Sequence, residues 1–104
     1  MILFRKPQDL DAFENRYNDF LALIERMPDI QRRQVINVLG SPVGEPRYYR
    51  VLEIYFADRP QLETSLRSKV GQEAGGELAR RFPADTFDAL FAEVYEESGG
   101  STPA

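Results

Sequence analysis

The sequence contains no histidine and no cysteine, and these two absences narrow the chemistry open to the protein. Histidine is the side chain that titrates near neutral pH, and a cysteine thiolate is a strong nucleophile and metal ligand. A histidine general base, a thiolate nucleophile and an imidazole or thiolate metal site are therefore excluded. The serines have no histidine to activate them, and no acidic cluster follows a calcium-loop pattern. We expect neither a metal ion nor another cofactor.

Positive charge is also scarce, because 13 basic residues stand against 17 acidic ones and the formal net charge is −4. A negative chain is repelled by nucleic acid and by anionic membrane surfaces, so neither is an expected partner. Apolar runs are short and the first residues carry no secretory signal pattern, which predicts a cytoplasmic protein. The 104 residues suit one domain, placed at residues 1–96, followed by a flexible tail at residues 97–104.

Strand and helix patterns alternate along the chain. A short apolar run at residues 2–4 predicts a first strand, and a stripe with the 3.6-residue period predicts a helix that Pro28 ends. Asp11 and Glu14 form a capping-box pattern at its start, with Asp9 as the alternative N-cap. The stripe consists of Leu10, Phe13, Tyr17, Leu21 (or Phe20), Ile24 and Met27.

The remaining elements are two strands, a second helical region and a last strand. Residues 30–39 and 48–56 are rich in β-branched and aromatic side chains, and a long loop with glycine and proline joins them as a hairpin. A second helix opens at residues 58–61, and glycines at positions 71, 75 and 76 favour its break into two shorter helices. Residues 87–95 are expected to form the last strand.

This order, β-α-β-β-α-β, is that of the ferredoxin-like α+β fold, an antiparallel four-stranded sheet with the helices on one face. Helices can cover only one side of such a sheet, yet both faces of the last strand are apolar. The uncovered face would then be an exposed apolar patch. We therefore expect a homodimer that packs two open sheet faces together.

The hairpin register decides which side chains share each face of the sheet. A register that pairs odd with odd residues groups an apolar set toward the helices. That set is Ile36, Val38, Leu52, Ile54 and Phe56, and the opposite face then holds Arg33, Val35, Asn37, Tyr49, Val51, Glu53 and Tyr55.

Several segments in this order resemble the EthD family, named for ethyl tert-butyl ether degradation, over about residues 1–96. They are Phe4-Arg5-Lys6-Pro7, Phe13-x-x-x-Tyr17, Met27-Pro28-Asp29-Ile30, the strand from Arg47 through Tyr48-Tyr49-Arg50 to Glu53-Ile54-Tyr55-Phe56, and Ser68-x-x-Gly71-Gln72. The resemblance implies a dimeric α+β barrel, an architecture shared with small cofactor-free monooxygenases and muconolactone isomerase. It also implies a histidine on the first helix, where this chain has Leu21.

The candidate catalytic residues are Glu53 and Tyr55. A desolvated carboxylate at Glu53 could act as a general base, and the alternative is a structural ion pair with Arg33 or with an arginine of a second subunit. Tyr49 and Tyr55 would orient a phenolic or ketone substrate, or else pack as strand residues with a polar tip. The expected pocket residues are Tyr17, Leu21, Arg33, Tyr49, Phe91 and Glu93.

Three functions fit these residues. The first is a cofactor-free oxidoreductase, resembling the monooxygenases, that acts on a small hydrophobic molecule of aromatic or quinone-like character. The second is a non-catalytic carrier or accessory protein with the same pocket, which the leucine at position 21 favours. The third is a purely structural dimer whose own side chains fill the barrel.

Overall fold

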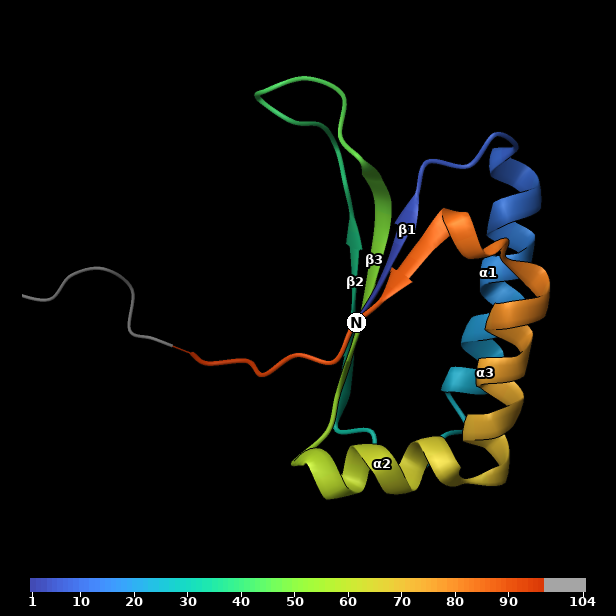
Figure 1. Ribbon diagram of the computed structural model, residues 1–104, viewed down its shortest axis with the longest axis vertical. Helices are drawn as coiled ribbons and strands as arrows, with labels where there is room; N and C mark the ends of the chain where they lie inside the picture. Colours follow the sequence, from blue (N-terminus) through green and yellow to red (C-terminus); the bar gives the residue numbers. More distant parts are fainter. Residues whose placement is uncertain (97–104) are drawn as a thin grey trace, which may run out of the picture.

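Four antiparallel strands form one sheet in the computed structural model, which describes residues 1–96 (Figure 1). Three α-helices and one short 3-10 helix connect them. The elements are β1 (Ile2–Arg5), α1 (Leu10–Ile24), β2 (Arg32–Asn37), β3 (Tyr48–Tyr55), α2 (Arg59–Arg67), α3 (Lys69–Arg81), η1 (Ala84–Thr86) and β4 (Phe87–Ala89). The flexible tail expected at residues 97–104 lies outside the described residues.

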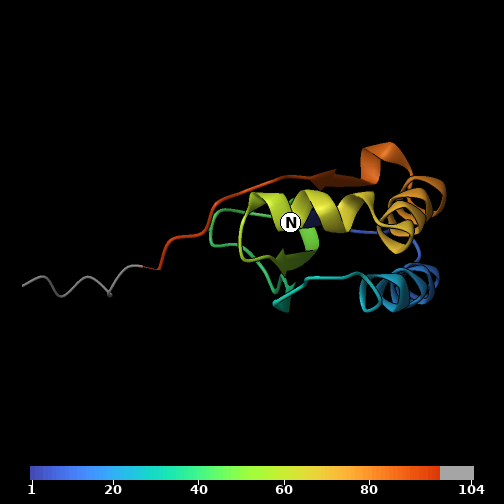
Figure 2. The ribbon, with the colours of Figure 1, turned by 90° about the horizontal axis from the view of Figure 1, so that it is seen from below.

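The strands follow the order β2-β3-β1-β4, and α1 and α3 lie on one face of the sheet (Figures 1 and 2). This is the ferredoxin-like α+β arrangement, so the predicted fold class is confirmed. Among residues 1–96, no helix lies against the opposite face, which is called the open face below. Within residues 1–96, no helix combines the length and the apolar character needed to cross a membrane.

Helix α1 begins at Leu10 because Asp9 caps it, with the Asp9 carboxylate accepting a hydrogen bond from the Ala12 N–H at 3.0 Å. The predicted capping box at Asp11 is therefore wrong, and the alternative cap is the correct one. Four side chains of this helix are fully buried, namely Phe13, Tyr17, Phe20 and Ile24. Phe20, not Leu21, is the member of the stripe that is buried in the core. Leu21 is only partly buried, beside the stripe.

The core centres on Phe4 of β1, which is fully buried. Its ring makes edge-on contacts with Phe13 and Tyr17 of α1 at centroid distances of 5.5 and 5.6 Å. The ring of Phe82, at the end of α3, lies 5.1 Å away. Aromatic pairs at these distances add to the free energy of burial, so this cluster fixes α1 and α3 on the sheet.

The predicted break of the second helical region is confirmed, and it lies at Ser68. This residue ends α2, and its hydroxyl accepts a hydrogen bond from the Gly71 N–H at 3.0 Å as the N-cap of α3. The two helices meet so closely there that a Cβ atom on Gly71 would lie 2.1 Å from the backbone oxygen of Ser65. Glycine is required at position 71 by this close approach.

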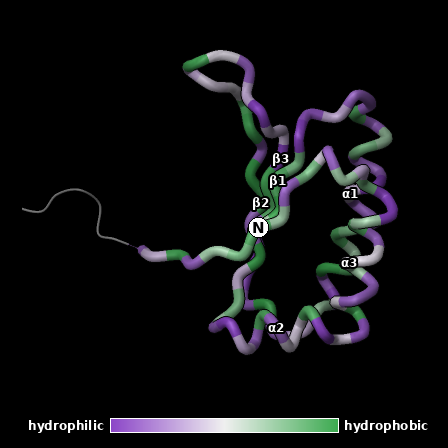
Figure 3. Tube along the Cα trace, in the orientation of Figure 1, coloured by the Kyte–Doolittle hydropathy of each residue, from purple (hydrophilic) through white to green (hydrophobic). Residues whose placement is uncertain are grey.

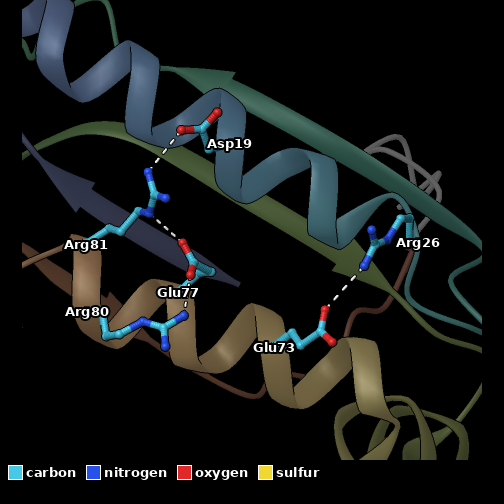
Figure 4. A network of polar contacts seen from close by, with 6 residues as sticks. All are labelled: Asp19, Arg26, Glu73, Glu77, Arg80 and Arg81. Atoms are coloured by element: carbon cyan, nitrogen blue, oxygen red, sulfur yellow. Dashed lines mark hydrogen bonds and ion pairs between the residues drawn. The ribbon is translucent and has the colours of Figure 1, made fainter.

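Ion pairs join α1 to α3 along their exposed sides (Figure 4). Arg81 reaches Asp19 at 3.0 Å, and Arg26, just after α1, reaches Glu73 at 3.3 Å. Within α3, Glu77 pairs with both Arg80 and Arg81. Exposed pairs of this kind stabilise a fold only modestly, so the two helices are held mainly by their buried faces.

The predicted hairpin register is wrong, because β2 and β3 pair odd with even residues. Val35 lies opposite Leu52, and Ile36 lies opposite Val51. Leu52, Ile54 and Phe56 pack toward the helices as expected, but Ile36 changes places with Val35. Arg33, Val35 and Asn37 consequently lie on the helix side. A ten-residue loop does not fix a register by its own geometry, and a slip of one residue reverses every side chain.

A bulge in β3 moves one more residue to the helix side. Phe4 pairs with Arg50 and Arg5 with Tyr48, which leaves Tyr49 without a partner on β1. The Tyr49 ring packs edge-on against Phe13 at 5.5 Å, so its predicted place on the open face is wrong. The extra residue turns Tyr49 and Arg50 toward the same side of the sheet.

The last strand is much shorter than predicted, since β4 ends at Ala89. It borders only β1, and Leu90 makes the final contact by exchanging backbone hydrogen bonds with Met1. Residues 91–96, called the arm below, then leave the sheet (Figures 1 and 2). Within residues 1–96 no strand is left beside the arm, so its strand-like pattern finds no partner.

Candidate functional site

A groove of about 540 Å³ lies between α1 and the β2 side of the sheet. Helix α1, the connection after it and two strands supply its walls. Apolar and polar residues both contribute to the lining. The lining residues are Leu21, Ile24, Glu25, Met27, Ile30, Gln31, Arg32, Arg33, Val35 and Leu52.

Leu21 and Ile24 are the residues through which α1 faces this groove, and the buried stripe turns Phe20 into the core instead. The EthD resemblance implies a histidine at position 21, so the leucine replaces a titratable ring with an alkyl chain. The side chain at position 21 therefore cannot accept or donate a proton. The Leu21 side chain can instead contact the apolar surface of a bound molecule.

Arg33 lies in the groove and pairs with Glu25 at 3.5 Å. Its predicted alternative role, an ion pair with Glu53 of the same chain, is wrong because β2 presents Arg33 on the helix side. Arg32 stacks its guanidinium over the ring of Tyr55 at 4.3 Å. Arg33 therefore places positive charge at the groove, whereas the guanidinium of Arg32 lies with Tyr55 on the open face.

A buried arginine forms the second unusual feature on this side of the sheet. The guanidinium of Arg50 donates to both oxygens of Glu14, at 2.7 and 2.9 Å, and its Nε donates to Asn37 at 3.0 Å. Rings of Phe13, Tyr17 and Tyr49 surround it at 5.5, 4.5 and 5.3 Å. A forked pair with one carboxylate and three aromatic faces compensates for the lost hydration of the charge.

This arginine lowers the pKa of Glu14, mainly through its hydrogen bonds to the carboxylate, against the opposing effect of burial. Tyr49 adds a further hydrogen bond to Glu14 at 3.3 Å. Tyr17 lies in the core beside Arg50, and burial is the main cause that raises the pKa of its phenol. Its hydroxyl has no hydrogen-bond partner within the described part of the chain.

Glu53 and Tyr55 lie together on the open face, away from the groove. The Tyr55 hydroxyl donates to the Glu53 carboxylate at 2.8 Å, and this bond is the main cause that raises the pKa of Tyr55. Apolar side chains next to them fill the middle of the face, where Val51 lies between Leu3 and Ile36. The structure thus separates the proposed proton-transfer pair from Leu21 and Arg33.

Phe91 and Glu93, expected on the last strand, belong to the arm instead. Phe91 is 72% exposed, and Glu93 accepts a hydrogen bond from the Tyr95 hydroxyl at 2.6 Å. Neither residue lines the groove of its own chain.

Sequence reasoning missed the pair of Arg50 and Glu14 as a site feature. A signal was present, since Arg50 alternates with Leu52 and Ile54, which were expected to face the helices. A buried guanidinium on that face requires an acidic partner from the helix that covers it. Glu14 on α1 is such a partner. The connection residues Met27, Ile30 and Gln31 gave no such signal, because only the turn after α1 brings them into the groove.

Two solved structures are similar to this chain. An EthD family protein from Bacillus halodurans C-125 is 26% identical with a TM-score of 0.84, and the match covers 90% of this chain and 94% of that one. A dimeric ferredoxin-like protein of unknown function from Jannaschia sp. CCS1 is 19% identical with a TM-score of 0.68, covering 89% and 95%. No family model and no curated protein matches the sequence. These likenesses confirm the EthD resemblance and the ferredoxin-like fold.

Proposed function

We propose that this EthD-like protein is a homodimer that binds a small hydrophobic molecule in the groove between α1 and β2. Its open sheet faces form the dimer interface, and each subunit keeps its own groove on the helix side. The observation that supports binding most directly is the apolar wall formed by Leu21, Val35 and Leu52.

The size of the groove matches that of small-molecule sites, and its lining combines apolar side chains with several polar ones. A volume of about 540 Å³ falls in the usual range of ligand pockets, roughly 300 to 1,000 Å³, which are mostly apolar with a few polar groups. Arg33 and Gln31 supply hydrogen-bond donors at one end of this groove. These donors favour a ligand with a carbonyl, hydroxyl or carboxylate oxygen on an aromatic or quinone-like body.

Binding without catalysis is the better-supported reading. The groove contains no histidine, Leu21 is inert, and the carboxylate of Glu25 is paired with Arg33. A cofactor-free oxidoreductase would need Glu53 and Tyr55, which lie on the other side of the sheet. A carrier or accessory role requires only the groove.

Replacing Leu21 with glutamate is expected to weaken the binding of anilinonaphthalene sulfonate, an apolar fluorescent anion, by about tenfold or more. The new carboxylate would lie in the apolar wall and repel the sulfonate. Ala22→Glu is the matched control, because position 22 is on the same helix but exposed to solvent. Fluorescence titration measures both affinities. Equal binding by the two variants would place the probe elsewhere, and no binding by the wild type would favour a purely structural dimer.

The proposed dimer interface is the open face, whose apolar centre is not covered by any helix of the part of the chain that the structure describes. The relative from Jannaschia sp. CCS1 is described as dimeric, which supports the same assembly here. Leu3, Ile36 and Val51 form the part of the face that a second subunit would cover.

Replacing Ile36 with glutamate is expected to dissociate the homodimer, because a charge would be buried between two apolar sheet faces. Val35→Glu is the control, since this neighbour on β2 points to the groove side. Light scattering during size exclusion should show half the wild-type mass for Ile36→Glu and the full mass for Val35→Glu. A wild-type protein that is monomeric at micromolar concentration would contradict the dimer.

A further inference from the structure

The groove between α1 and β2 contains an arginine whose hydrogen-bonding capacity is largely unused. Arg33 projects from β2 on the helix side, and 33% of its side chain is exposed. Among residues 1–96 its one acidic partner is Glu25, at 3.5 Å. Charge-assisted hydrogen bonds are shorter, about 2.7–2.9 Å, so this pair is loose. A guanidinium carries several N–H donors in a planar fork, and within this part of the chain most of those of Arg33 have no acceptor.

Arg50 on β3 shows the contrasting state of a guanidinium whose partners are complete. It donates to both carboxylate oxygens of Glu14, at 2.7 and 2.9 Å, and to Asn37 at 3.0 Å. Three aromatic rings surround it, and only 11% of its side chain is exposed. Arg50 is thus committed to the fold. Of these two arginines, Arg33 is the one that can bind a ligand.

Glu25 can leave Arg33 without disturbing the fold. It is the C-cap residue of α1, but its capping hydrogen bonds come from the backbone N–H, and 58% of its side chain is exposed. Water solvates such a carboxylate well, so an exposed ion pair of this kind contributes little to stability. The Glu25 side chain can therefore turn outward when another anion approaches Arg33.

Apolar side chains accompany the Arg33 guanidinium in the groove. Val35 lies two residues along β2 on the same face, and Leu21 and Leu52 belong to the same lining. Figure 3 shows that hydrophobic positions recur on both α1 and the strands that face it. Apolar walls exclude water, and an interaction between charges strengthens as the surrounding dielectric constant falls. An anion carried on an apolar body would therefore bind Arg33 more strongly than the exposed Glu25 carboxylate does.

We infer that the groove selects organic anions: an apolar molecule with a carboxylate or a similar oxyanion binds Arg33 and displaces Glu25. Glu25 is then an internal competitor that lowers the affinity for the anion. This inference rests on the proposed binding groove, and it narrows the ligand from oxygen-bearing molecules in general to acids. Because the formal net charge of the chain is −4, long-range attraction does not favour an anion, and the selection depends on Arg33.

Two fluorescent probes with the same ring system separate the oxyanion from the apolar body. Anilinonaphthalene sulfonate carries a sulfonate, and N-phenyl-1-naphthylamine is its neutral counterpart without that group. Arg33→Gln is expected to weaken binding of the sulfonate by about tenfold and to change binding of the neutral probe by less than about twofold. Glu25→Gln should strengthen binding of the sulfonate by about threefold, because the competing carboxylate is gone. A partly unfolded variant would bind both probes more tightly, so a gain confined to the sulfonate reports on Arg33.

The exposed ion pair between Arg26 and Glu73 supplies the matched controls (Figure 4). Arg26→Gln and Glu73→Gln change the net charge by the same amounts as the two test variants, but neither residue lines the groove. Both controls should keep the wild-type ratio of the two probe affinities. Fluorescence titration of each protein with each probe measures these affinities.

An Arg33→Gln protein that binds the sulfonate as tightly as Arg26→Gln does would overturn the inference. A Glu25→Gln protein that binds it no more tightly than Glu73→Gln would do the same. The proposed groove would still stand in either case if Leu21→Glu weakened binding of the neutral probe. A wild-type protein that binds neither probe would remove the groove and its selectivity together.

Discussion

Replacing Gly71 with alanine is expected to destabilise the protein by about 3 kcal/mol, an unusually large effect for the addition of one methyl group. The new Cβ atom would lie 2.1 Å from the backbone oxygen of Ser65 and 2.8 Å from that of Leu66. Both atoms belong to the backbone of α2, so no side-chain rotation relieves the overlap. Helices α2 and α3 would have to separate at their junction, where the Ser68 hydroxyl also caps α3.

Gly75→Ala is the matched control within the same helix. A Cβ at Gly75 meets no atom within 4 Å, and alanine is the better helix former by about 1 kcal/mol. The two alanine variants should therefore shift the free energy of unfolding in opposite directions. Urea denaturation followed by circular dichroism measures both. A Gly71→Ala protein as stable as the wild type would show that α2 and α3 do not approach so closely.

Removing Glu14 is expected to destabilise the protein more than removing its partner Arg50. The side chain of Arg50 is only 11% exposed, whereas that of Glu14 is 37% exposed. In Glu14→Leu the guanidinium stays buried without its carboxylate, which should cost about 3 kcal/mol. In Arg50→Met the remaining carboxylate can turn to water, and the methionine fills the space between the rings. We expect about half the cost for that variant.

The double variant Glu14→Leu with Arg50→Met completes the comparison. It leaves neither charge unpaired, so its stability should exceed that of Glu14→Leu alone. Urea denaturation of the four proteins gives the coupling free energy. If Glu14→Leu were no worse than Arg50→Met, the guanidinium would have to be hydrated, against its observed burial.

The pH dependence of stability gives an independent check on this pair. Arg50 holds the pKa of Glu14 below its ordinary value of 4.5 in the folded state. The stabilisation from this carboxylate is therefore fully present above about pH 4.5 and is lost as the pH falls through the lower, folded pKa. The difference in the free energy of unfolding between the wild type and Glu14→Leu should therefore decrease in that acid range.

The sequence by itself determined the order and type of the elements, because their signals are local. The stripe that includes Phe13, Tyr17 and Ile24 predicts α1. The sequence offered Asp11 and Asp9 as possible N-caps, and the structure selects Asp9. The glycines at positions 71, 75 and 76 predict two helices in place of one, although the break lies at Ser68 and all three glycines lie within α3. Each of these features depends on residues a few positions apart, and from them follow the ferredoxin-like fold and the EthD resemblance.

Only the tertiary structure decided which residues share a face of the sheet. The pairing of Val35 with Leu52 and the bulge at Tyr49 depend on contacts between distant segments, and the long hairpin loop leaves the register free. The same contacts bury Arg50 against Glu14 and bring Leu21 and Arg33 to one groove. The strand pattern of residues 87–95 is local as well, but a strand also needs a neighbour. Within residues 1–96, β1 provides that neighbour only as far as Leu90.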